Sequence, residues 1–67
     1  MTDAQALKRL KHWQRRDRER WVDIELSYRN VLVNLFWGEN PVRQIGCVAG
    51  VSVADCVDHL EKQGVMK

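Results

Sequence analysis

Apolar residues recur with a helical period along the first half of the chain. Thr2 and Gln5 have the spacing of a capping box, which predicts a helix that begins near Asp3. No glycine or proline interrupts the sequence before Gly38. At about 100° per residue, one helical face, broken only by Asp17, collects Ala6, Leu10, Trp13, Trp21, Ile24, Tyr28, Val31 and Leu35. This pattern fits either one long helix or two helices bent near Asp17.

The segment from Trp21 to Phe36 is apolar around most of the circumference of the predicted helix. Its polar stripe is narrow and consists of Asp23, Ser27, Asn30 and Asn34. A helix this apolar is buried on more than one side. A chain of 67 residues has little core of its own, so we expect part of that burial to come from a second subunit.

Glycine, proline and capping residues divide the second half of the chain. Gly38 ends the first helical region, and a short helix is predicted from Pro41 to Ala49. Gly50 stops this helix, and a last helix begins with Ser52 as its cap and ends at Gly64. The sequence therefore predicts an all-α fold with a long N-terminal helix and two shorter helices.

Residues 43–60 resemble the helix-turn-helix of bacterial and phage DNA-binding regulators. Gly46 stands where the family needs a small residue between crossing helices, and Gly50 stands at the turn. The family's buried positions hold Ile45, Ala49, Val51, Cys56 and Leu60. Residues 59–66 resemble the end of a winged-helix recognition helix. Residues 28–52 resemble the fourth region of sigma factors and related response-regulator domains equally well, so no subfamily is assigned. The resemblance implies one helix-turn-helix domain over residues 1–67, with residues 1–20 as a basic helical arm.

This resemblance implies sequence-specific binding to double-stranded DNA by a small transcriptional regulator. The last helix would lie in the major groove and face the bases with Ser52, Val53, Ala54, Val57 and Asp58. Arg43 and Gln44 would contact backbone phosphates. A homodimer, which palindromic operators require, would form through Leu7, Leu10, Trp13 and Trp21.

Charge is distributed unevenly along the chain. The formal net charge is +2, but residues 1–20 carry seven Lys/Arg against three Asp/Glu. This segment is either a solvated helix face or a phosphate-binding arm, formed by Lys8, Arg9, Lys11, Arg15, Arg16, Arg18 and Arg20. The last helix is acidic, with Asp55, Asp58 and Glu61 against Lys62. An alternative function is therefore a protein-interaction module, such as an inhibitor or adaptor of a polymerase, a nuclease or another regulator.

Other classes of function find little support in the sequence. Two cysteines without a preceding signal peptide favour a protein of the reducing cytoplasm, and the apolar run 31–37 is too short to cross a membrane. Cys47, Cys56 and His59 lack a nearby fourth ligand for zinc, so we expect no metal or other cofactor. No phosphate-binding glycine loop or catalytic triad pattern is present, which predicts that the protein is not an enzyme.

Overall fold

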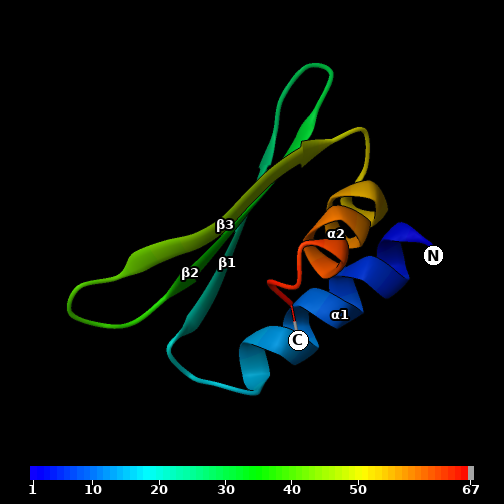
Figure 1. Cartoon of the computed structure of the whole chain (residues 1–67). Helices are drawn as coiled ribbons and strands as arrows, with labels where there is room; N and C mark the ends of the chain where they lie inside the picture. The colour runs from blue at the N-terminus through cyan, green and yellow to red at the C-terminus, as the bar shows by residue number, and fades with distance from the viewer. Residues whose placement is uncertain (67) are drawn as a thin grey trace.

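Two helices pack on one face of a three-stranded sheet in the computed structural model, which describes residues 1–66 (Figure 1). The chain order is α1 (Asp3–Arg15), β1 (Arg20–Leu26), β2 (Val31–Trp37), β3 (Arg43–Gly50) and α2 (Val53–Lys62). The strands are antiparallel and lie in the order β1-β2-β3. Helix α1 packs on β1, and α2 packs on β2 and β3, so the other face of the sheet is uncovered (Figure 1).

The all-α prediction is wrong, because residues 20–37 form a hairpin instead of a helix. Trp21 pairs with Phe36 across β1 and β2, and the ladder runs to the end of both strands. Along β1, Val22 and Ile24 are half-buried while Trp21 is exposed, which is the period of two that a strand requires. The turn at residues 27–30 contains neither glycine nor proline, and the N–H of Ser27 donates to the carbonyl of Asn30 at 2.9 Å.

The helix predicted from Pro41 to Ala49 is also wrong, because this segment holds β3. Residues 43–50 pair with β2, so the part of the chain that the structure describes contains no helix-turn-helix. Gly46 still serves close packing: a Cβ there would lie 3.2 Å from Cγ1 of Val65 and 3.3 Å from Cδ2 of Leu60. The small residue therefore lets α2 and the C-terminal segment approach a strand, not a neighbouring helix.

The predicted start of α1 and both predicted ends of the last helix are confirmed, whereas the helix ends predicted at Gly38, Pro41 and Gly50 lie next to strands or at the end of one. Gln5 donates its backbone N–H to Oγ1 of Thr2 at 3.1 Å, and its side chain accepts from the N–H of Thr2, so the capping box is complete. In the same way, the N–H of Asp55 donates to Oγ of Ser52 at 3.1 Å at the start of α2. Gly64 follows α2 with a φ of 76°, a backbone conformation that favours glycine.

A single core fills the space between the helices and the sheet. It consists of Ala6, Leu10, Trp13, Val33, Leu35, Val48, Val53, Cys56, Val57 and Leu60. The core side chains of both layers, the helices and the sheet, thus come from one copy of the chain. Neither of the two helices within residues 1–66 is long and apolar enough to cross a membrane.

Candidate nucleic-acid interface

The residues predicted to read bases do not form a groove-facing surface. Val53 and Val57 lie in the core, and Val57 has no exposed surface. Ser52 uses its hydroxyl to cap α2, and Ala54 donates its backbone N–H to Oδ1 of Asp3 at 3.1 Å. Asp58 is occupied by an ion pair with Lys62 at 3.0 Å, which lowers the pKa of the Asp58 carboxyl. The N-terminus of α2 is therefore closed by the protein's own groups and presents no row of side chains to a DNA groove.

Arg43 and Gln44 lie on β3 and not at the start of a helix. They stand at the end of this strand farthest from Ser52, which is roughly 25 Å away at about 3.3 Å per residue. Gln44 donates from Nε2 to Oδ1 of Asn34 at 3.0 Å, and Asn34 donates to Asp23 at 3.4 Å. Gln44 thus belongs to a polar strip across the sheet and is separated from the helices.

The four residues predicted to form a dimer interface do not share one surface. Leu10 and Trp13 are 2% and 3% exposed within a single chain, so they pack in its core and do not face a partner. Leu7 lies on α1 and Trp21 lies on β1, at an exposed position that alternates with the residues facing the helices. A dimer built from these residues together would require the core to open.

The solvent-facing side of α1 is basic from Lys8 to Arg15. Burial of Ala6, Leu10 and Trp13 fixes the rotation of the helix and turns the opposite positions outward. Those outward positions have the spacing i, i+3, i+4, i+7 and hold Lys8, Lys11, His12 and Arg15. No acidic residue occurs between Asp3 and Asp17, so nothing within the helix neutralises this row.

A hollow of about 320 Å³ lies where α1 ends and the chain turns into β1. Its lining is cationic apart from one amide and consists of Lys11, Gln14, Arg15, Arg18 and Arg20. Arg20 is held in place because it donates to the carbonyl of Trp13 at 3.1 Å and lies 4.7 Å from the centre of the Trp13 ring. The sequence indicated the basic residues of this site, but the half-buried Gln14 was missed, since only the turn brings it beside Arg18 and Arg20.

Asp17 and Glu19 are the two acidic residues next to this hollow in sequence, and the carboxylate of Asp17 is already engaged. It accepts hydrogen bonds from the N–H of Glu19 at 2.9 Å and from Nε1 of Trp37 at 3.1 Å. The backbone hydrogen bond from Glu19, and next the one from Trp37, lower the pKa of Asp17 below its ordinary value. Asp17 therefore organises the turn and does not line the hollow.

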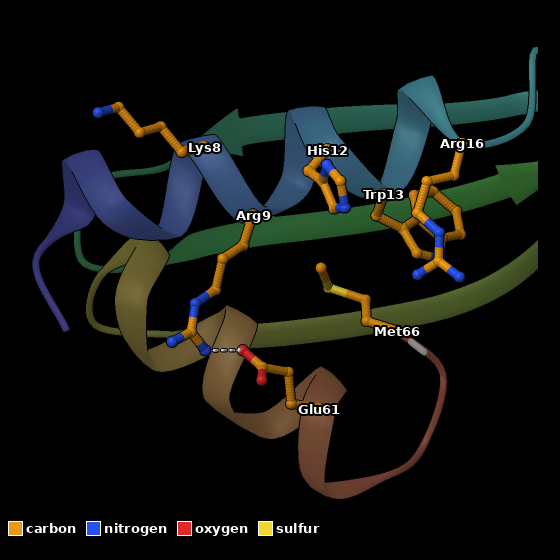
Figure 2. Close-up of a pocket in the computed structure, with 7 residues that line it drawn as sticks. All are labelled: Lys8, Arg9, His12, Trp13, Arg16, Glu61 and Met66. Atoms are coloured by element: carbon orange, nitrogen blue, oxygen red, sulfur yellow. Dashed lines mark hydrogen bonds and ion pairs between the residues drawn. The ribbon is translucent and has the colours of Figure 1, made fainter.

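Most cations of α1 have no carboxylate partner. Within residues 1–66 the ion pairs are Arg9–Glu61 at 2.6 Å, Lys62–Asp58, and His59–Asp55 at 3.5 Å. Arg9 is thus tied to α2 across the gap between the helices, as Figure 2 shows. The cations of α1 and the following turn that enter none of these pairs are Lys8, Lys11, Arg15, Arg16, Arg18 and Arg20.

The cysteines do not create a metal site. Among the described residues, no three His, Cys, Asp or Glu side chains come together to hold an ion. Cys47 is exposed, whereas Cys56 is buried and donates from Sγ to the carbonyl of Val31 at 3.3 Å. Burial raises the pKa of the Cys56 thiol, which therefore stays protonated at neutral pH. As expected from the sequence, Cys56 occupies an apolar core position.

Comparison with known protein families, curated proteins and solved structures finds no match to this chain.

Proposed function

We propose that the chain binds the phosphate backbone of double-stranded DNA through the solvent-facing side of α1 and the turn that follows it. The observation that carries the proposal is the row of cations without carboxylate partners that runs from Lys8 to Arg18. Helix packing holds these residues on one side of the molecule. A fixed row of Lys and Arg without local counter-charges is what a polyanion binds best.

The dimensions of α1 suit a DNA backbone. From Lys8 to Arg15 the helix axis rises about 10 Å, and phosphates of one strand follow each other every 3.4 Å or so along the duplex axis. The basic hollow at the end of α1 adds Arg18 and Arg20 to this row. About five cations can therefore contact phosphates at once.

Binding of this kind depends little on base sequence. Phosphate contacts position a protein on DNA, whereas base-edge contacts specify the sequence. An amide side chain can both donate to and accept from a base edge, and the basic hollow contains one, Gln14. Gln14 is half-buried. We do not propose that α2 contacts bases, because Val53 and Val57 are buried in the core.

Salt dependence of duplex binding tests the proposal. Five phosphate contacts give a slope of about −4.5 in log K against log salt, so affinity falls several-hundred-fold between roughly 50 and 200 mM salt. Two labelled duplexes of unrelated sequence and a duplex RNA are titrated in parallel by fluorescence anisotropy. We expect similar affinities for both DNA duplexes. Absence of binding at low salt, or a slope near zero, contradicts the proposal.

A charge-matched pair of variants locates the surface. The variant Lys11→Glu/Arg15→Glu reverses two exposed charges on α1, and Arg29→Glu/Arg43→Glu makes the same change in net charge on the hairpin and on β3. We expect the first variant to lose binding and the second to keep most of it. Equal losses in both variants would show that overall charge, and not α1, determines binding.

A second candidate function is self-association through the uncovered face of the sheet. Trp21 is 52% exposed and pairs across the strands with Phe36, and these two residues line a shallow apolar hollow with Val42. A second copy would cover this cluster by packing sheet against sheet, as in two-layer β structures. Sedimentation velocity over a hundredfold range of concentration tests this: a concentration-dependent dimer that Trp21→Ser abolishes supports it, and a monomer throughout excludes it.

A further inference from the structure

A second hollow, of about 530 Å³, lies between α1 and the C-terminal segment (Figure 2). Figure 2 shows His12 and Trp13 extending from α1 and Met66 extending toward them from the other side, with Arg16 alongside Trp13. The pair Arg9–Glu61 closes one end of the hollow, and Lys8 points away from the other side chains. A space of this volume is in the range of pockets that bind small molecules.

The polar groups around this hollow are mostly hydrogen-bond donors. Glu61 is the carboxylate of the lining, and its Oε1 already accepts from Arg9 at 2.6 Å. Arg16 is a donor at every nitrogen and enters no ion pair within residues 1–66, and His12 can donate from its ring. A ligand that matches this lining must bring acceptors and negative charge.

Trp13 adds an independent indication of a missing acceptor. The side chain is only 3% exposed, and its indole Nε1 has no hydrogen-bond partner among the described residues. An unsatisfied buried donor destabilises the fold relative to a satisfied one. In the described part of the chain, Trp13 Nε1 is the one buried side-chain N or O atom without a hydrogen-bond partner, and Trp13 lines the hollow.

We propose that this hollow is a binding site for a phosphate monoester of nucleotide size, with Arg16 and Trp13 Nε1 as donors to the phosphate and Met66 against the base. A phosphate monoester supplies the charge that Arg16 lacks and the oxygen acceptor that Trp13 lacks. The thioether of Met66 provides an apolar surface suited to a flat ring. The phosphate belongs either to a free nucleotide or to the 5′ end of a nucleic acid. Lys8 and Arg16 also belong to the row of cations proposed to bind duplex DNA. However, Lys11 and Arg15, which the duplex-binding test reverses, do not line this hollow, so the two proposals can fail separately.

The indole N–H resonance of Trp13 in a ¹⁵N–¹H spectrum of the full chain tests the proposal. Its assignment follows from the variants Trp21→Phe and Trp37→Phe, which remove the other two indole signals. Adenosine 5′-monophosphate, adenosine, and a tetranucleotide with and without a 5′-phosphate are titrated at constant ionic strength. We expect a saturable downfield shift with the phosphorylated probes, the signature of a new acceptor at Nε1.

Two matched variants complete the test. Arg16→Gln should weaken binding of adenosine 5′-monophosphate at least tenfold, and Arg29→Gln, with the same loss of charge on the hairpin, should leave it unchanged. A shift with the phosphorylated tetranucleotide alone assigns the phosphate to a nucleic-acid end. No shift with either phosphorylated probe, an equal shift with adenosine, or an unaltered affinity in Arg16→Gln overturns the proposal.

Discussion

Two valines three residues apart distinguish the observed fold from a helix-turn-helix. Val48 lies on β3 and is 8% exposed, whereas Val51 follows the strand and is 81% exposed. In the helix-turn-helix pattern Val51 takes a buried position between the helices. The same substitution, Val→Ala, therefore has opposite expected effects at the two sites under the two folds.

The magnitude follows from burial. Val48→Ala removes two methyl groups from the core, each worth about 0.8 kcal/mol, and leaves a small cavity, so we expect a loss of about 2 kcal/mol. Val51→Ala removes the same atoms from a side chain mostly in water and should cost no more than about 0.3 kcal/mol. For a domain of this size, 2 kcal/mol corresponds to a decrease in Tm of about 8–16 °C.

Urea unfolding followed by circular dichroism measures both variants against the unsubstituted chain. The total stability expected for 67 residues is roughly 3–10 kcal/mol, so Val48→Ala remains folded and measurable. Val33→Ala, on β2 and without exposed surface, serves as a positive control with a loss similar to that of Val48→Ala. A loss at Val51 equal to that at Val48 would refute the reasoning and restore the helical arrangement.

Three further predictions concern single groups. The ion pair Arg9–Glu61 has both side chains partly in water, so a double-mutant cycle with alanine should give a coupling energy of no more than about 1 kcal/mol. The pKa of Asp17 is lower in the folded chain than in the unfolded chain, so the charged carboxylate stabilises the fold above its unfolded pKa. This stabilisation is lost as the pH falls through the folded pKa. In urea unfolding at a series of pH values, Asp17→Asn should therefore lose less stability on acidification than the unsubstituted chain does. Iodoacetamide should modify Cys47 in the folded protein and Cys56 only after denaturation, as mass spectrometry can show.

Part of the candidate site could be predicted from the sequence. The surplus of basic residues in the first 20 positions is visible without any structure, and the spacing of Leu10 and Trp13 indicates which side of the helix is buried. The hollows could not be predicted, because each combines α1 with residues from a turn or from the far end of the chain. Arg20 and Met66 reach these sites only through tertiary contacts.

The sequence alone determined the start of α1 and both ends of α2. Thr2, Ser52 and Gly64 act through hydrogen bonds and backbone conformations within a few residues of themselves, so their effect does not depend on the rest of the fold. Helix α1 ends at Arg15, close to Asp17, where a bend was one of the two alternatives that the sequence allowed.

Only the tertiary structure decided that residues 20–50 form a sheet. Ile24, Val31 and Leu35 satisfy a period of 3.6 and, once the chain reverses at residues 27–30, also a period of two. That reversal carries no glycine or proline to mark it. Strand pairing joins residues up to 17 positions apart in β1 and β2, and its hydrogen bonds form only when both strands are in place. Apolar periodicity indicated the burial of Ile24, Val31 and Leu35, but it also placed on the buried face Trp21 and Tyr28, which are 52% and 94% exposed. Which apolar residues are buried, and by what, is fixed by contacts between distant parts of the chain.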